Sequence, residues 1–439
     1  MKPVKQDVFS KKNSTLAPPF EDSPARPLVV RFRESFQWKQ VFTALRYRNY
    51  RLWFWGQMIS LFGTWMQMTA QGFLIFELTH SPAYLGYAAF AMGIPTWLFM
   101  IYGGVLADRM PRRNLLIITQ TIMMALAVIL AALTFLKIVQ PWHIIGLAFG
   151  LGTSNAFYAP ARQAFILELV EREDMTNAIA LNSAMFNSAL ALGPAVSGII
   201  YALFGPAWCF AVNAVSYMAV IIALFLMRIP PPTNSNRRNS VRADLKEGML
   251  YILNHRMIRT LIVMVGLTCL FGVSYITLIP AWAVNILGGD ATTNGILHSV
   301  RGFGALLSAL MIASLGRFQF KGRLLTLGSL IFPILLLIFS FMHWLPLSLV
   351  TIFCVGVAAM IIFNLANALV QTLVTDDLRG RVMSIYSLAF FGLYPLGSLW
   401  VGLIAEHINE PFSLIVNSVI LLGFFILIRI FVPKLYDLS

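Results

Sequence analysis

The chain has 439 residues, 58% of them hydrophobic and only 11% charged, with a formal net charge of +14. A soluble domain of this size needs far more charge to cover its surface, so the composition excludes an ordinary soluble globular protein. Weakly alternating apolar segments, which are typical of an outer-membrane barrel, are absent. We therefore expect an all-α membrane protein, because apolar runs in lipid satisfy their backbone polar groups as helices.

The chain begins with a polar segment that lacks the apolar region of a cleavable signal. We expect residues 1–50 to form a cytoplasmic tail. Ser35 can cap a short helix along the membrane surface, because four apolar residues share one of its faces: Trp38, Val41, Phe42 and Leu45.

Twelve membrane-spanning helices are predicted, each close to the roughly 20 residues that a bilayer requires. The first six fall at 52–77, 84–106, 114–136, 142–166, 177–203 and 206–227. The second six fall at 258–284, 292–314, 324–342, 346–370, 381–405 and 411–431.

A polar linker separates these two sets. It starts at Pro230 and continues into a stretch where five apolar residues recur at helical spacing: Val241, Leu245, Met249, Ile252 and Leu253. This pattern predicts an amphipathic interfacial helix, as a mechanical tether rather than a regulatory docking element. The predicted domains are the tail 1–50, an N-terminal six-helix half 51–228, the linker 229–257, a C-terminal six-helix half 258–432 and a tail 433–439.

The positive charge is distributed as membrane topology requires, and not as a nucleic-acid-binding patch. With the N-terminus in the cytoplasm, all 32 Lys and Arg residues except Lys137 and Arg301 fall on the cytoplasmic side. This bias predicts a multi-pass membrane protein with both termini cytoplasmic. Its basic surface is expected to meet anionic lipids and not nucleic acid.

The two halves resemble each other in sequence. Leu61-Phe62-Gly63 matches Leu270-Phe271-Gly272 at an offset of 209, as Gly86 matches Gly295 and Gly93 matches Gly302. Three further matches share an offset of 204: Gly193 with Gly397, Gly198 with Gly402 and Asn213 with Asn417. The halves are therefore predicted to be pseudo-symmetric, with a binding site between them near the membrane midplane.

Residues 103–114 read GGVLADRMPRRN between two uncharged runs, which predicts a tight, glycine-containing turn. Gly104-Val105-Leu106-Ala107-Asp108-Arg109-Met110-Pro111-Arg112-Arg113 resembles the signature loop of the major facilitator superfamily, with Pro111 where Gly is usual. The run Phe157–Ala164, with Leu192-Gly193-Pro194, further resembles a bacterial exporter group that contains the enterobactin exporter and macrolide efflux proteins.

The resemblance implies a gate at this loop. Asp108 would hold the outward-open state by accepting hydrogen bonds from the N-terminus of span 381–405 and from a cation, for which Arg162 is the predicted partner. Gly104, Arg109, Arg112 and Arg113 complete the motif. The basic residues also touch lipid phosphates, or they act only in setting orientation.

Arg301 is the only Lys or Arg deep within a predicted span, where an unpaired charge is unfavourable by several kcal/mol. His298 lies three residues before it, on the same helix face. One hypothesis is that Arg301 engages an acidic group of the substrate and His298 titrates. The alternative is a structural pair of Arg301 with a helix end or with a carboxylate such as Glu77 or Glu406.

Other polar residues form stripes within the spans. Gln67 and Gln71 lie on one face of span 52–77, and Asn364, Asn367 and Gln371 lie on one face of span 346–370. The resemblance implies that these spans line the cavity, where Asn155, Tyr275 and Tyr394 can add hydrogen bonds. Polar contacts that merely join helices are the alternative.

The expected function is secondary active export of a small amphipathic, siderophore-like or drug-like molecule by a monomer. Uptake on the same fold and a non-transporting membrane sensor are the alternatives. An enzyme is not expected, since the chain lacks Walker, HExxH and GxSxG sequences. No cofactor or metal is expected, and the proton gradient supplies the energy. No carboxylate lies at mid-membrane, so Glu77 is the preferred proton carrier and His298 the second choice.

Overall fold

A computed structural model describes residues 42–228, 241–315, 320–436 and 438. Most of the predicted tail helix and the Pro230–Asn239 part of the linker lie outside these residues. Short elements within the described ranges are η1 (Thr43–Arg46), η2 (Arg172–Asp174) and η6 (Pro433–Leu435).

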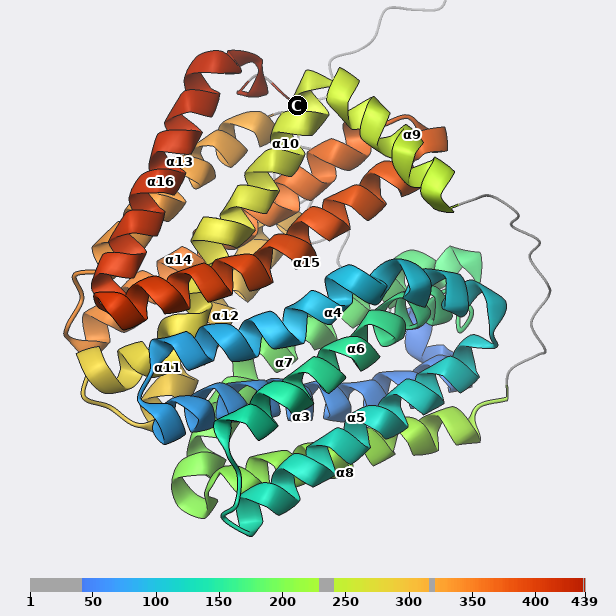
Figure 1. The fold of residues 1–439 in the computed structure, drawn as a ribbon. Coiled ribbons are helices and arrows are strands. Elements are labelled where there is room, and N and C mark those ends of the chain that lie inside the picture. Colours follow the sequence, from blue (N-terminus) through green and yellow to red (C-terminus); the bar gives the residue numbers. More distant parts are fainter. Residues whose placement is uncertain (1–41, 229–240, 316–319, 437, 439) are drawn as a thin grey trace, which may run out of the picture. The chain divides into compact units, whose positions relative to one another are not determined.

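Long helices follow one another along the chain (Figure 1). In the N-terminal half they are α3 (Arg48–Thr79), α4 (Pro82–Arg109), α5 (Arg112–Phe135), α6 (Pro141–Ile166), α7 (Met175–Phe204) and α8 (Pro206–Leu226). In the C-terminal half they are α10 (Arg256–Leu267) with its continuation to Ile286, α12 (Ala291–Leu315), α13 (Lys321–Phe339), α14 (Leu345–Leu373), α15 (Asp376–His407) and α16 (Glu410–Phe431). These twelve segments coincide with the twelve predicted spans.

Ten stretches of the described chain are long and apolar enough by themselves to cross a membrane. The two long helices outside that set are α3 and α6, because their polar and glycine residues lower the mean hydropathy. Proline opens α4, α6 and α8, where its missing N–H leaves no hydrogen bond unmade.

The segment predicted as a single helix over 258–284 is irregular in the structure. After α10 it passes through a π turn, η3 (Thr268–Gly272), and a 3-10 stretch, η4 (Val273–Leu278). It ends with α11 (Ile279–Ala281) and a second π turn, η5 (Trp282–Ile286). Pro280 has no N–H to give to the preceding turn, which accounts for the interruption there. Irregular turns of this kind frequently mark functional sites.

Two helix crossings join the halves, and they are related by the sequence repeat. Helix α4 packs beside α15 (Figure 1), and α7 packs on α12. A Cβ atom on Gly402 would lie 2.8 Å from the Pro82 carbonyl oxygen, and one on Gly198 would lie 2.8 Å from the equivalent oxygen of Ala291. The predicted pseudo-symmetry is therefore confirmed in the packing, because matched glycines allow both crossings.

We call the side with the α4–α5 connection the Asp108 face and the side with the α3–α4 connection the opposite face. The glycine crossings lie toward the opposite face. Buried apolar residues form one large cluster within each half, and a small cluster of Leu61, Met185 and Ala189 also lies in the N-terminal half. Another cluster, toward the opposite face, joins the N-terminal half to Ala281 and Ala291 of the C-terminal half.

Helix α9 (Val241–Asn254) contains the described part of the linker, and it packs on α15 (Figure 1). Arg381 of α15 forms an ion pair with Glu247 at 2.6 Å. Gly248 brings the α9 backbone against the same Arg381 side chain. The predicted amphipathic helix is thus present, and it docks on the C-terminal half.

Candidate functional site

The loop at residues 103–114 is shorter than the sequence suggested. Helix α4 continues to Arg109, and only Met110 and Pro111 separate it from α5. The prediction of a glycine-containing turn was therefore wrong. Both glycines lie within α4, which ends only where proline disfavours helical geometry in the residue before it.

Gly103, which directly precedes the motif, is sterically required, whereas the motif glycine Gly104 is not. A Cβ atom on Gly103 would overlap the Ala156 carbonyl oxygen of α6. A Cβ atom on Gly104 would have no neighbour within 4 Å. Gly103 therefore allows the close packing of α4 on α6.

Asp108 is largely exposed in this structure, with 62% of its side chain accessible. It lies 3.9 Å from Arg112, which also forms an ion pair with Glu168 after α6. Arg162, the predicted partner of Asp108, instead faces the Tyr158 hydroxyl on its own helix. The predicted Asp108–Arg162 pair is thus absent from the described contacts, because the two side chains have different neighbours.

The remaining basic residues of the motif differ in their contacts. Arg113 donates to the Phe225 carbonyl oxygen at 3.1 Å and so holds α5 to the C-terminal end of α8, where a cation is favoured. Arg109 is exposed. Arg113 therefore has a structural contact in addition to any role in topology.

Four predicted site residues come together inside the C-terminal half. The charge of Arg301 acts on both His298, on α12, and Tyr275, in η4. Tyr275 in turn lies within electrostatic range of Tyr394 on α15. The Tyr394 hydroxyl lies 3.4 Å from the Thr277 hydroxyl, which donates to Ser398 at 2.9 Å. The irregular part of the seventh span thus supplies Tyr275, which lies within electrostatic range of Arg301, and Thr277, which contacts α15.

Arg301 has no carboxylate partner among the described residues. Its Nε atom is buried without a hydrogen bond. The two carboxylates predicted as alternative partners have other contacts: Glu77 accepts from Tyr201, and Glu406 accepts from Ser81 at 2.5 Å. The alternative of a structural Arg301–carboxylate pair is therefore wrong for this structure.

The predicted polar stripes are largely occupied by contacts within the protein. Gln67 is buried and accepts from Asn213 of α8 at 2.7 Å, so it joins helices. Gln371 donates to Asn367 on the same helix at 2.6 Å. Gln71 is buried, whereas Asn155 and Asn364 are half-buried. The structure does not bring these residues into the Arg301 cluster.

Sequence reasoning missed a buried carboxylate at the opposite face. Glu410, at the first position of α16, is 5% exposed and accepts from Asn285 of η5 at 2.7 Å. Glu406 also accepts from the backbone N–H of Ala83 at 3.3 Å, so it caps the N-terminus of α4. The predicted span starting at 411 placed Glu410 just outside the membrane, although the Pro411 that follows it is a helix-start signal.

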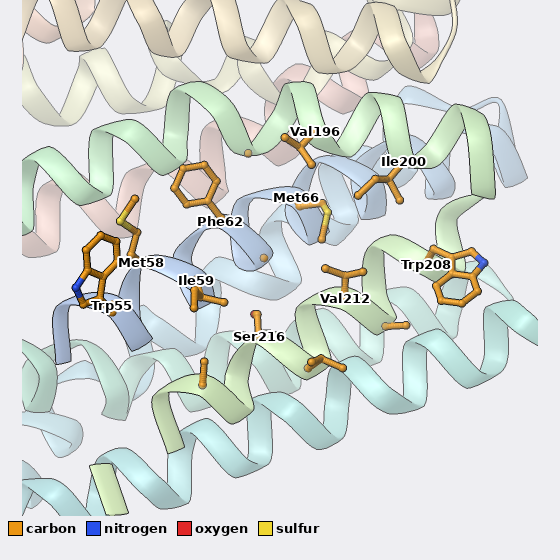
Figure 2. Close-up of a pocket in the computed structure, with 15 residues that line it drawn as sticks. Trp55, Met58, Ile59, Phe62, Met66, Val196, Ile200, Trp208, Val212 and Ser216 are labelled. Carbon is orange, nitrogen blue, oxygen red and sulfur yellow. The ribbon is translucent and has the colours of Figure 1, made fainter. Parts of the chain in front are cut away.

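A separate groove of about 630 Å³ lies between α3, α7 and α8 (Figure 2). Trp55 and Trp208 lie at its two ends, and its labelled lining is almost entirely apolar. Ser216 is its polar exception. None of the predicted site residues lines it, so this groove is distinct from the Arg301 cluster.

Comparison with known proteins gives a consistent family. The sequence profile of the family described as transmembrane secretion effector matches residues 39–438. The staphyloferrin A transporter of Staphylococcus aureus is 26% identical over 348 residues, which cover 78% of this chain and 86% of that protein. Macrolide efflux protein A of Streptococcus pyogenes is 22% identical, covering 83% of this chain and 92% of its own length.

A solved structure shares the fold. The bacterial homologue of the human lysosomal transporter Spinster, in an inward-facing and unoccupied conformation, superposes with a TM-score of 0.70 at 14% identity. The match covers 90% of this chain and 98% of that chain. The predicted superfamily and its fold of two six-helix halves are confirmed.

Proposed function

Because this chain belongs to the transmembrane secretion effector family of the major facilitator superfamily, we propose that it exports a small amphipathic molecule by proton-driven alternating access. The chain is a multi-pass membrane transporter of small molecules and not an enzyme. The names of its relatives favour a siderophore-like or drug-like cargo.

One observation carries the proposal of alternating access. Symmetry-related glycine crossings close the halves together toward the opposite face, while Asp108 on the other face is 62% exposed and, among the described residues, has its ionic contact with Arg112 of its own half. A second state needs only the reverse arrangement, in which the two halves meet at the Asp108 face and separate at the opposite face. The interior is then open alternately to each side.

The direction of export rests on the charge distribution. The Asp108 face holds the basic residues that are typical of a cytoplasmic side, so we assign it to the cytoplasm of a bacterial inner membrane, with both termini there. In this state the cargo enters from the cytoplasm. The protein functions as a monomer whose basic face meets anionic lipids.

Proton coupling has three candidate carriers. Glu77 bridges α3 to Tyr201 of α7, His298 lies beside Arg301, and Glu410 is a buried carboxylate with an amide partner. Glu77 remains our first choice because its contact with Tyr201 ties α3 to α7, and α7 forms one of the two crossings between the halves. Glu77→Gln should abolish stimulation by a proton gradient while leaving exchange of cargo across the membrane intact.

The test of function has two steps. Untargeted mass spectrometry of spent medium, from a deletion strain and its complemented parent under iron-limited and iron-replete growth, should reveal one metabolite that is lost outside and accumulates inside. Flux of that metabolite is then measured in everted vesicles with and without an imposed proton gradient. Uphill accumulation inside everted vesicles supports export, and uptake by right-side-out vesicles alone would overturn it.

A further inference from the structure

The charge balance around Arg301 points to a ligand. Arg301 lies ten residues after Ala291, the start of α12, which is about 15 Å along the helix at about 1.5 Å per residue. Every described Asp and Glu lies instead in a connection, in the first or last turn of a membrane helix, or on α9. The described chain therefore supplies no negative charge at the depth of Arg301.

The side of α12 that carries Arg301 is its interior side. Asn294 and Ser308 lie seven residues before and after Arg301, on the same helix face, and both are buried. Like Arg301, each has a buried polar atom without a hydrogen-bond partner. Phe303 and Leu310, on the other side of α12, are 44% and 60% exposed. The unpaired polar groups therefore face the interior of the protein and not the lipid.

The neighbours of Arg301 favour an organic anion over an inorganic one. Tyr275 lies within electrostatic range of the guanidinium, and His298 adds an imidazole one helical turn before it. Tyr394 lies within electrostatic range of Tyr275, and its hydroxyl is 3.4 Å from the Thr277 hydroxyl. Tyr275 itself packs near the Phe339 ring, with centroids 6.4 Å apart. A guanidinium offers paired N–H donors to a carboxylate, and aromatic rings offer an apolar surface to the body that carries it.

We propose that Arg301, with Tyr275, Tyr394 and His298, forms the binding subsite for a carboxylate group on the transported molecule. The inference rests on the proposed transport function and names its substrate class as amphipathic organic carboxylates. The carboxylate neutralises Arg301, while the hydroxyl groups of Tyr275 and Tyr394 can donate to its oxygens.

Binding of three probes of one shape tests the charge preference. Benzoate, benzamide and benzamidine share a ring and differ in charge, and inorganic phosphate supplies an anion without an apolar body. Their dissociation constants are measured by saturation-transfer NMR on the purified protein in nanodiscs. We expect benzoate to bind at least about tenfold more tightly than the other three. Equal or tighter binding of benzamide, benzamidine or phosphate would overturn the proposal.

Variants locate the preference at Arg301. Arg301→Met should reduce the benzoate-to-benzamide ratio to about one, and Arg301→Lys should leave an intermediate ratio because it keeps the charge but loses the paired donors. Lys137→Met removes the other basic residue outside the basic face, is exposed, and should leave the ratio unchanged. A preference that survives Arg301→Met would place the site elsewhere.

Stability separates a ligand site from a structural role. Removing the half-buried, unpaired charge of Arg301 should raise the ligand-free thermal midpoint, by about 2–4 °C, whereas loss of a structural partner would lower it. Binding needs neither a gradient nor a direction, so its result is independent of the vesicle flux. A charge preference without export would refute only the proposed function, and export without a charge preference would refute only the subsite.

Discussion

Two adjacent glycines of α4, Gly103 and Gly104, have different surroundings. The backbone of α6 lies directly against Gly103, and open space lies beside Gly104. A glycine in a helix is justified by packing only at the first of these positions, because glycine otherwise destabilises a helix by roughly 1 kcal/mol relative to alanine.

Alanine substitutions at Gly103 and Gly104 should therefore change the free energy of unfolding in opposite directions. Gly103→Ala should lower the free energy of unfolding by about 1–3 kcal/mol, since the added methyl group forces α4 away from α6. Gly104→Ala should leave it unchanged or raise it by roughly 0.5–1 kcal/mol. Thermal unfolding of the purified variants in one detergent measures both. Equal effects of the two substitutions would contradict this account.

Gln67 is predicted to act as a helix contact and not as a substrate ligand. Its amide oxygen accepts from Asn213, which also accepts from Ser216 at 2.9 Å, and both Gln67 and Asn213 are buried. Asn213→Leu should lower the free energy of unfolding by about 1 kcal/mol, because the Gln67 amide loses its partner. Combining it with Gln67→Leu should recover part of that loss.

A double-mutant cycle on thermal stability gives the coupling between Gln67 and Asn213. Transport by the double variant should remain within about twofold of the wild type, since a twofold change is well under 1 kcal/mol. Loss of transport with intact stability would indicate instead that Gln67 contacts the substrate in the cavity.

The candidate site was only partly predictable from the sequence. Helical spacing was sufficient to place His298 and Arg301 on one face. The approach of Tyr275 and Tyr394 depends on tertiary packing of three different segments, which no local pattern reports. Glu410 was missed because hydropathy ends a span at a charge, although the residue is buried.

At the scale of elements, helix positions followed from apolar length and from prolines at helix starts. The π and 3-10 turns between Thr268 and Ile286 did not, because hydropathy is insensitive to hydrogen-bond register. The two crossings between halves were indicated only by glycines that recur at fixed offsets. In the structure Gly86 packs against Gly402, and Gly295 packs against Gly198, so the recurring glycines are the contact points of the crossings.

A larger residue at one of these crossings should change the conformational equilibrium. In Gly402→Leu, the new Cβ atom alone would lie 2.8 Å from the Pro82 carbonyl oxygen, so α4 and α15 must separate toward the opposite face. A cysteine at position 83, where Ala83 is now 6% exposed, should then react faster with a membrane-impermeant maleimide. The native cysteines are replaced in this background.

Gly423→Leu is the matched control, because Gly423 of α16 has open space beside it. This substitution should leave the labelling rate at position 83 unchanged. If both leucine variants gave the same rate, the Gly86–Gly402 contact would not hold the halves together.

At the scale of the whole molecule, carboxylates lie at both faces, and we expect them to stabilise different states of the proposed transport cycle. Carboxylates at the opposite face, such as Glu77 and Glu406, accept hydrogen bonds that hold helices together in this state. Asp108 at the other face lies 3.9 Å from Arg112 and is 62% exposed, so its carboxylate can serve the proposed second state. In the proposed cycle the halves contact each other at one face at a time, which would keep the interior sealed from the other side.

Asp108→Asn should therefore act on the second state and not on the one described here. An exposed pair at 3.9 Å contributes at most about 1 kcal/mol, so the thermal midpoint and membrane insertion should remain close to those of the wild type. Loss of the carboxylate weakens the contacts that the second state needs at the Asp108 face. Destabilising that state by about 1.4 kcal/mol lowers its population about tenfold, and transport should fall in proportion.

Three measurements on Asp108→Asn separate this account from a general defect. Expression and thermal midpoint should match the wild type, vesicle flux should fall, and maleimide labelling at position 83 should slow because the opposite face opens less often. Glu173→Gln, an exposed acid on the same face, should change none of the three. Faster labelling at position 83 would mean that Asp108 stabilises the state closed at the opposite face, which contradicts the role proposed for it. Normal flux from well-expressed protein would show that Asp108 takes no part in gating.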